Sequence, residues 1–497
     1  MFASTWILLA FVICILLYIF CIKPYIFWYT KRVPGPIPVP IFGNILENIL
    51  QIKPFTNVIT DYCKAFEKHR YYGFYQFSKP VLILNDLQLI KQMSIKDFEH
   101  FADHGTNSRE DIDEYFCKIL FALKGESWRR MRTTISPVFT GSKMRFLFGL
   151  VRDCAENAVS YLHEQKEEVI EVEMKDFSGR IGNDVIASCS LGITCDSLRN
   201  PENEFYVNSI KNFNFVGSRL MVLYAFIFNA YPNLLKLFGI RIFGKKMTSF
   251  FNKVIADSIK YRKDNNVTRS DVIQLLMDVK KEKSFITDHD IVAQALSFFF
   301  AGFETVTYSI SFMCYELALN PDVQDKLYEE IQATFEGDVN YEAFAKMKYM
   351  DMVITETLRR WGPSVVIDRV CTKDYKIPAK LPNERDLLIK KGQLIFIPVH
   401  AMHWNPEIYE DPHRFYPERF LDKNSADPNN LLSFGIGPRS CIGSRFAILE
   451  CKLMLAYLLK DYEIVPIART KIPIKLSKKH MGASAEGGFW MGLKRRN

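Results

Sequence analysis

Hydrophobic and polar residues alternate at helical spacing along most of the chain, and this pattern predicts a mainly helical protein. From Gly125 onward, long helical periodicities dominate, with breaks at proline or glycine. The longest predicted helix covers residues 287–319. Thr287 and Asp288 are suited to cap its start, and Asn320 precedes the proline that ends it.

A smaller β region is predicted beside these helices. Short apolar runs bounded by turns, such as residues 81–84 and 394–397, indicate strands. No internal repeat or low-complexity tract divides the 497 residues, and an apolar share of 48% is enough for a large core. The expected fold class is therefore mainly α with a small β region, and residues 42–497 form one main domain.

The first 22 residues carry no charged side chain, and they are long enough as a helix to cross a hydrocarbon core of about 30 Å. A cleaved signal peptide would need a positive start and a small-residue cleavage site, and neither is present. Positive charges at Lys23, Lys31 and Arg32 follow the apolar run, which places the remaining chain in the cytosol. Residues 1–22 are therefore predicted to be a retained transmembrane anchor.

Residues 23–41 are predicted to be a proline-rich hinge between this anchor and the main domain. Prolines at positions 34, 36, 38 and 40 block helix formation and give a stiff connector. A second apolar segment, residues 213–250, is too short to span a bilayer and carries interspersed cations. It is either core or a membrane-surface contact, and periodicity does not separate the two.

Charge and cysteine usage exclude several classes of protein. The net charge of +8 comes from dispersed basic residues rather than a Lys/Arg block, so nucleic-acid binding is not implied. The 11 cysteines include no C-x-x-C pair, which argues against a disulfide framework and against structural zinc. A reducing compartment fits this usage.

One cysteine lies in a loop with unusual chemistry. Cys441 follows Arg439 and precedes Gly443 and a helical pattern over residues 444–459, so a cation and a helix N-terminus both favour its thiolate. Gly437 permits positive φ, Gly443 permits close approach of a flat group, and Phe434 is placed to cover the sulfur. An isolated cysteine is usually inert and buried, but this setting suggests an axial thiolate on haem iron.

The predicted long helix contains a second unusual segment, Ala301-Gly302-Phe303-Glu304-Thr305. A mid-helix glycine costs on the order of 1 kcal/mol relative to alanine, and it removes a side chain where a ligand can pass. Thr305 can bond back to a carbonyl one turn earlier and loosen the helix. A groove opened in this way would hold O₂, with Glu304 and Thr305 relaying protons; the alternative is a kinked core helix.

Together these motifs resemble the cytochrome P450 family, the haem-thiolate monooxygenases. The resemblance rests on F-x-x-G-x-R-x-C-x-G around Cys441, on A-G-x-E-T, and on the P-G-P-x-x-x-P hinge. It also rests on W-x-x-x-R, E-x-x-R and P-E-R-F, and it covers the whole chain in order. Residues 139–145 are similar to the insect microsomal detoxification branch. The fold this implies is a single catalytic domain of that type behind the anchor.

The resemblance implies roles for individual residues. Cys441 would be the axial ligand of haem b, and Glu304 and Thr305 would deliver protons. The haem propionates would be held by Trp128, Arg132, Arg369 and Arg439. A buried triad of Glu356, Arg359 and Arg419 would lock the core behind the haem, although E-x-x-R alone reads as a surface ion pair. Family geometry further gives an aromatic, apolar substrate pocket formed by Phe116, Phe213, Phe298, Ala301 and Phe489.

The implied activity is insertion of one oxygen atom of O₂ into an apolar xenobiotic or lipid-like molecule, on the cytosolic face of the endoplasmic reticulum. Electrons would come from NADPH through a flavoprotein reductase, because the chain has no G-x-G-x-x-G loop. Lys124, Arg129 and Arg130 are candidate docking residues for that reductase. Two alternatives remain open: a haem-thiolate isomerase or dehydratase acting on peroxides, and a non-enzymatic haem-based binder.

Overall fold

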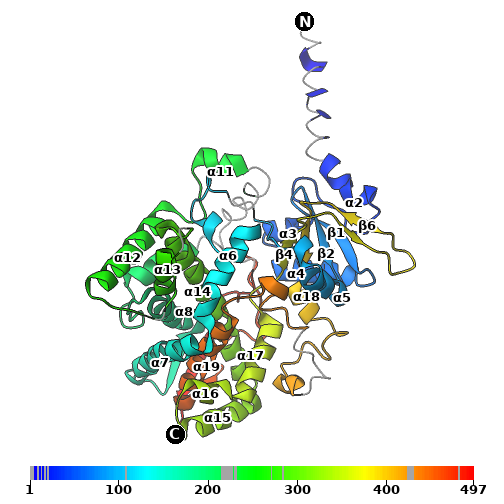
Figure 1. Ribbon diagram of the computed structural model, residues 1–497. Helices are drawn as coiled ribbons and strands as arrows, with labels where there is room; N and C mark the ends of the chain where they lie inside the picture. The colour runs from blue at the N-terminus through cyan, green and yellow to red at the C-terminus, as the bar shows by residue number, and fades with distance from the viewer. Residues whose placement is uncertain are drawn as a thin grey trace.

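The longest helix, α14 (Asp288–Leu319), runs through the middle of the helical part of the molecule (Figure 1). Its start is fixed locally, because the Asp290 amide donates to the Thr287 hydroxyl at 3.2 Å and the Thr287 amide donates to the Asp290 carboxylate at 2.9 Å. Thr287 is confirmed as the cap, but its partner is Asp290 rather than Asp288.

The computed structural model describes residues 5–7, 11–12, 14–15, 18, 22–106, 109–213, 228, 232–269, 271–282, 285–421, 430–479 and 482–496. The described helices are α2 (Phe27–Thr30), α3 (Leu46–Ile49), α4 (Phe55–Ala65), α5 (Leu87–Lys91), α6 (Gly125–Ile135), α7 (Gly141–His163), α8 (Met174–Ile186), α9 (Glu204–Phe213), α11 (Pro232–Phe238), α12 (Lys245–Asp264), α13 (Val272–Glu282), α14, α15 (Pro321–Phe335), α16 (Tyr341–Ala345), α17 (Lys348–Trp361), α18 (Val399–His403) and α19 (Ser444–Asp461). Short 3₁₀ or π turns are η2 (Lys23–Ile26), η3 (Gln92–Lys96), η4 (Phe98–His100), η5 (Phe116–Lys118), η6 (Ser136–Phe139), η7 (Ala187–Leu191), η9 (Pro417–Phe420) and η11 (Gly437–Arg439).

The strands form three small sheets, two of which join distant parts of the chain. The strands are β1 (Tyr71–Gln76), β2 (Lys79–Leu84), β3 (Val169–Glu173), β4 (Ile367–Val370), β5 (Tyr375–Ile377), β6 (Leu387–Ile389), β7 (Leu394–Ile397), β8 (Tyr462–Val465) and β9 (Trp490–Arg495). One sheet has the order β1-β2-β7-β4, another β3-β9-β8, and the third pairs β5 with β6. β2 and β7 are parallel, with Val81 opposite Leu394, and all other neighbours are antiparallel.

The predicted fold class is confirmed in its main part, because helices dominate, and the sheet that contains β1, β2 and β4 lies to one side of them (Figure 1). Both predicted strand segments are present, as β2 and β7. The predicted anchor at residues 1–22 lies largely outside the described residues. Within the part of the chain that the structure describes, α14 is the one helix long and apolar enough to cross a membrane, and 61% of that apolar window is buried in protein.

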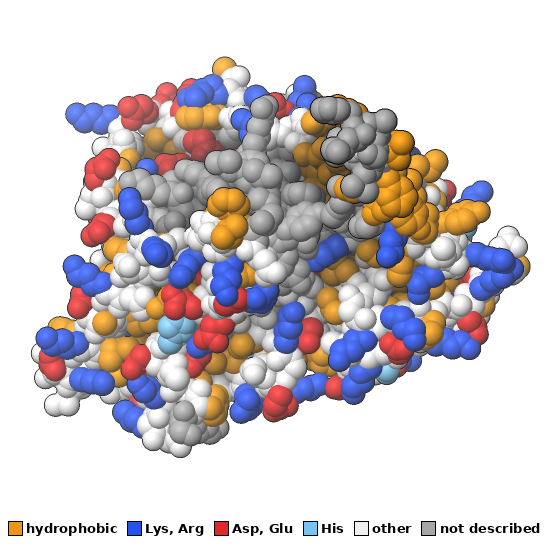
Figure 2. All heavy atoms as spheres, turned by 90° about the horizontal axis from the view of Figure 1, so that it is seen from above, with side chains coloured by type: hydrophobic (Ala, Val, Ile, Leu, Met, Phe, Trp, Pro, Cys, Tyr) orange, Lys and Arg blue, Asp and Glu red, His pale blue; other side chains and the backbone are white. Residues whose placement is uncertain are grey.

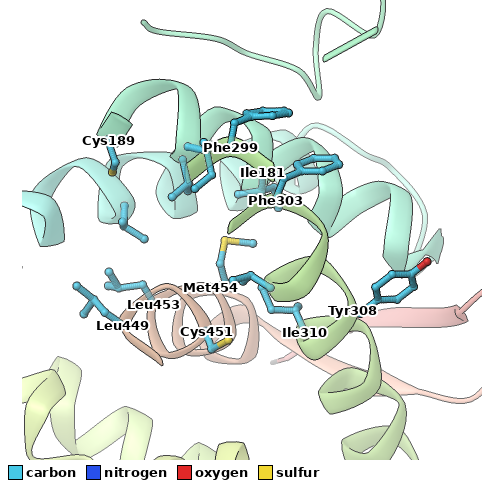
Figure 3. Close-up of a cluster of buried hydrophobic side chains, with 14 of the residues drawn as sticks. Ile181, Cys189, Phe299, Phe303, Tyr308, Ile310, Leu449, Cys451, Leu453 and Met454 are labelled. Atoms are coloured by element: carbon cyan, nitrogen blue, oxygen red, sulfur yellow. The ribbon is translucent and has the colours of Figure 1, made fainter. Parts of the chain in front are cut away.

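Helices α8 and α14 pack closely, and small residues on α8 make this possible. The Ser178 hydroxyl of α8 donates to the Thr307 carbonyl of α14 at 3.3 Å. A Cβ on Gly179 or Gly182 would already touch Thr307 side-chain atoms at 3.6 Å. Figure 3 shows Ile181 of α8 beside Phe299 and Phe303 of α14, with α19 below them. This three-helix junction forms one wall of the candidate site.

Candidate active site

A cavity of about 640 Å³ lies between α14, β4 and the loop that precedes α19. It is lined by Cys441 and Phe434 of that loop, and by Ala301, Glu304 and Thr305 of α14. Its volume is in the range of pockets that hold a cofactor or a small molecule. Two motifs that are far apart in the sequence therefore meet at one internal space.

Glycines shape the loop that carries Cys441. Gly437 has φ of +72°, as its sequence position predicted, and a Cβ there would lie 2.1 Å from the Ser94 carbonyl oxygen. The Cys441 amide donates to the Phe434 carbonyl at 2.7 Å, which closes the loop. α19 begins at Ser444, so the thiol lies next to a helix N-terminus as expected.

The thiol of Cys441 does not show the low pKa expected from its neighbours. Burial raises its pKa above the usual value, against the smaller opposing effects of the Gly443 amide and the Arg132 charge. Cys441 is an exposed residue, and it lines the cavity. The helix and arginine are too weak to supply a thiolate here, whereas a bound metal ion deprotonates a coordinating thiol.

Cations gather around this loop and at one end of the cavity. The Arg132 guanidinium of α6 donates to the Ser440 carbonyl at 2.8 Å. The Arg439 guanidinium lies 4.0 Å from the Trp128 ring centre, and it also donates to the carbonyls of Ala102 and Leu123. Of the four predicted propionate ligands, Arg439 and Arg369 line the cavity, whereas the described lining does not include Trp128 or Arg132.

This end of the cavity fits an anionic group. Arg369 is 2% exposed, and its Nε has no hydrogen-bond partner among the described residues. Its Nη1 donates to the Asp368 carbonyl at 2.8 Å. A buried guanidinium with an unused donor favours a carboxylate neighbour. A thiol at the cavity wall and a cationic end together match a flat, iron-containing cofactor that carries carboxylates, as haem does.

Sequence reasoning missed His104, which lies at the same end of the cavity. His104 is 8% exposed, and its Nδ1 is 2.9 Å from the Asp368 carboxylate of β4. Burial lowers the pKa of the imidazole, with the Asp368 carboxylate opposing the shift. No sequence signal marked His104, because its partner is 264 residues away and no local motif surrounds it.

Glu304 and Thr305 face the cavity from α14. The Thr305 hydroxyl donates to the Ala301 carbonyl at 2.6 Å, which is the back-bond expected from the sequence. The expected loosening does not follow, since α14 continues without a break. Burial raises the pKa of the Glu304 carboxyl, and the Lys175 charge and the Tyr308 hydroxyl oppose this shift. A carboxyl with a raised pKa beside a hydroxyl is suited to transferring protons.

Gly302 lines the cavity, and it has a second role that the sequence did not indicate. A Cβ at this position would lie 2.6 Å from Cδ1 of Ile186, the last residue of α8. Ile186 therefore packs closely beside Gly302, and both residues line the cavity. The glycine is required by close helix packing.

The structure brings Glu356, Arg359 and Arg419 together in the core. Glu356 and Arg359, on α17, are both 0% exposed and share two hydrogen bonds of 2.8 and 2.9 Å. The Arg419 Nε donates to the same carboxylate at 3.1 Å. Arg359 also donates to the backbone carbonyls of His403 and Pro412. A surface ion pair is thereby excluded for this E-x-x-R segment.

The structure places two of the five predicted pocket residues at the cavity. Phe298 and Ala301 line the cavity, and Phe298 stacks on Phe139 at 5.8 Å. Phe116 instead packs edge-to-face on Phe243, and Phe489 on Phe312, so the described lining includes neither of them. Their positions were inferred by analogy, whereas the local packing turns them into the core. The side chain of Phe213, at the end of α9, lies outside the described residues.

Comparison with known proteins agrees with this geometry. The family model for cytochrome P450 matches residues 33–489. Cytochrome P450 9e2 of Blattella germanica is 37% identical over 95% of this chain and 94% of its own length. Probable cytochrome P450 9f2 of Drosophila melanogaster is 38% identical over 95% of each chain. Cytochrome P450 6k1 of Blattella germanica is 34% identical over 93% of this chain and 92% of its own.

The match covers every segment that builds the cavity, from the cysteine loop to the acid and hydroxyl of α14. A family whose members carry a haem held by a cysteine thiolate and use O₂ explains the lone thiol, the cationic end and the proton-carrying pair together. This chain therefore belongs to the cytochrome P450 family and is a monooxygenase.

Proposed function

We propose that the chain is a membrane-bound monooxygenase that inserts one oxygen atom of O₂ into an apolar small molecule of the xenobiotic or lipid-like class. The observation that carries this proposal is the shared cavity, in which Cys441 and the Glu304–Thr305 pair line one space. An acid and a hydroxyl facing the thiolate-bound cofactor are what controlled proton delivery to bound oxygen requires.

The chain's own residues would bind and orient the cofactor. Cys441 would be the iron ligand, and Gly443 leaves the loop open beside it, since a Cβ there would meet only the Phe139 ring at 3.9 Å. The carboxylates would be held by Trp128, Arg132, Arg369 and Arg439. Trp128 and Arg132 also contact the cysteine loop, at Arg439 and at the Ser440 carbonyl. When bound, haem supplies the iron centre at which O₂ is activated.

The lining of the cavity supports an apolar substrate. Apolar side chains contributed by several elements face this space, and they are Ile119, Val138, Phe139, Phe298, Phe300, Ala301 and Val366. Such a lining binds by burial of apolar surface, whereas the few polar groups orient the molecule. A detoxification role is in keeping with the similarity to insect members of the family.

The end of the molecule that carries the N-terminal segment and α11 is suited to contact a membrane. The described part of the N-terminal segment exposes Trp6 and Phe11, and α11 exposes Leu237 and Phe238 by 75% and 68%. Figure 1 shows α11 at the end from which the N-terminal segment rises, and Figure 2 shows hydrophobic side chains gathered on that face. We place this face on the cytosolic side of the endoplasmic reticulum membrane.

NADPH would supply electrons through a flavoprotein reductase that docks on the Cys441 side. Lys124 and Arg130 are exposed there, whereas Arg129 is bound to Glu99 at 2.7 Å. Charge reversal at Lys124 and Arg130 should lower reductase-supported turnover and its salt dependence. A parallel reversal at Lys253, on α12, is the matched control. Unchanged turnover in the first variant would remove these residues from the docking face.

The deciding test is the carbon monoxide difference spectrum of the reduced full-length protein, with Cys441→Ser as control. We expect a thiolate-type Soret band that the variant loses. Turnover of an alkoxycoumarin, whose dealkylation releases a fluorescent phenol, should then require NADPH, reductase and O₂ together. A histidine-type spectrum, or turnover of an organic peroxide without NADPH as the only activity, would contradict the proposal.

A further inference from the structure

Helices α8 and α14 run in opposite directions against each other, and this fixes which side chains meet. Ile186 at the end of α8 lies against Gly302, and Ser178 near its start donates to the Thr307 carbonyl. One turn before Ser178, Lys175 therefore lies at the level of Tyr308. The first turn of α8 thus reaches α14 just beyond Glu304.

Lys175 and Tyr308 are in contact. The Lys175 Nζ lies 4.6 Å from the centre of the Tyr308 ring. Lys175 is half-buried and still reaches solvent, whereas Tyr308 is 6% exposed. The Tyr308 hydroxyl is buried and makes no hydrogen bond of ordinary geometry among the described residues, but Glu304, Lys175 and Ser484 all lie within its range of interaction. Figure 3 shows this side chain pointing away from the cluster around Met454.

Tyr308 and Glu304 lie one turn apart on the same face of α14, and both line the cavity. The Lys175 charge and the Tyr308 hydroxyl both act on the Glu304 carboxyl. The other groups that face this path are Glu173, which caps α8, and Ser484. The path from the surface to the cavity therefore runs from solvent to the Lys175 ammonium, then to the Tyr308 phenol and the Glu304 carboxyl.

We propose that Lys175 and Tyr308 form the outer part of a proton path that reloads Glu304 from solvent. This inference rests on the proposed function, in which Glu304 and Thr305 pass protons into the cavity. Neither Lys175 nor Tyr308 touches the reacting atoms, so both are relay residues.

The transfer is a sequence of balanced proton steps. The Tyr308 O–H bond breaks as its proton forms an O–H bond on the Glu304 carboxylate. One N–H bond of the Lys175 ammonium then breaks to restore the Tyr308 O–H. The neutral amine of Lys175 takes a proton from solvent water, so one proton moves inward and no electrons are exchanged.

The test uses the full-length holoprotein with reductase in phosphatidylcholine vesicles and an alkoxycoumarin as substrate. Lys175→Met removes the ammonium at similar length, Lys175→Arg keeps a cation, and Tyr308→Phe removes one oxygen atom. Lys253→Met, an exposed lysine of α12, is the matched control. The readouts are product and peroxide formed per NADPH, the rate ratio between H₂O and D₂O, and turnover driven by added hydrogen peroxide, which supplies oxygen already reduced and protonated.

We expect Lys175→Met and Tyr308→Phe to lower NADPH-driven turnover by about tenfold, less than the ~100-fold expected for loss of a donor acting directly. Their D₂O effect should increase, whereas peroxide-driven turnover and the carbon monoxide spectrum should match wild type. Lys175→Arg should restore most of the rate. Tyr308→Phe keeps the test decisive if a Lys175 variant fails to bind haem.

Two results would overturn the path. The first is that both Lys175→Met and Tyr308→Phe form as much product per NADPH as wild type and show the same rate ratio between H₂O and D₂O. The second is an equal loss in NADPH-driven and peroxide-driven turnover, which would assign both side chains to packing. Failure of the proposed function is distinct, because it appears in the wild-type spectrum itself.

Discussion

The hydroxyl of Thr305 donates to the Ala301 carbonyl, yet α14 does not depend on it, because the helical backbone bonds remain. Thr305→Ala should therefore fold and bind haem normally. Peroxide released per NADPH should rise several-fold, and product should fall by about tenfold or more, since a proton donor facing the cavity is lost. Thr307→Ala, whose hydroxyl bonds to Phe303 away from the cavity, is the matched control. Unchanged coupling in Thr305→Ala would exclude the relay role.

Glu450 is a second carboxyl that the mechanism does not use. It lies on α19 and is 1% exposed, and both of its oxygens lack a partner among the described residues. Burial raises its pKa to about 8. Since the folded-state pKa lies above the unfolded one, the protein loses stability as pH rises from about 4.5 to about 8, by at most roughly 5 kcal/mol.

Glu450→Gln should remove this dependence. Thermal unfolding of the holoprotein, followed between about pH 5 and pH 8, should show a flatter stability profile in the variant than in wild type. Glu463→Gln, at a partly exposed carboxyl of β8, serves as the control. Parallel profiles for wild type and Glu450→Gln would show that this carboxyl is solvated or paired in solution.

Functional residues that belong to a local sequence motif could be predicted from the sequence. Residues whose surroundings come from distant parts of the chain could not. Cys441, Glu304 and Thr305 belong to dense motifs, and the structure places all three at one cavity. His104 depends on Asp368 of another element, and Phe489 depends on Phe312. The pKa of Cys441 was misjudged because burial of its thiol is a property of the folded chain.

At the scale of elements, the contact between α8 and α14 depends on Gly302. Gly302→Ala should destabilise the protein by about 1–2 kcal/mol, because overpacking against Ile186 outweighs the better helix propensity of alanine. Ile186→Val removes the Cδ1 atom that the new Cβ would meet. The double variant should recover most of the loss, which unfolding of all four proteins would measure as a coupling energy. Additive effects would show that the two side chains do not meet.

Elements with local end signals were predicted well. α14 begins one residue after its predicted start and ends where predicted, because a capping box and a proline act within a few residues. β2 and β7 were predicted as strands, but their parallel pairing was not, because nothing in either segment specifies a partner more than 300 residues away. The packing of Ile186 against Gly302 was not predicted for the same reason, since Ile186 belongs to a different helix.

At the scale of the whole molecule, the apolar end should bind membranes even without residues 1–22. We expect a chain lacking residues 2–22 to keep its carbon monoxide spectrum and to bind phosphatidylcholine vesicles more weakly than the full chain. Replacing Leu237 and Phe238 with Ser in that truncated chain should lower its partition coefficient onto the vesicles by a further factor of about ten. Tyr261→Ser, at a similarly exposed side chain of α12, is the control. Equal partitioning of the truncated chain and its double variant would remove α11 from the contact.

The sheet β3-β9-β8 has a consequence for how the chain is made. β9 is the middle strand, and it consists of residues 490–495, so β3 has no partner until synthesis has passed residue 495. β2 likewise lacks its parallel partner until β7 has been synthesised. When the ribosome releases Cys441 and its loop, the sheet β1-β2-β7-β4 already has all its strands, whereas the sheet β3-β9-β8 still lacks its middle strand. Cofactor loading should then be a late event that follows completion of this sheet.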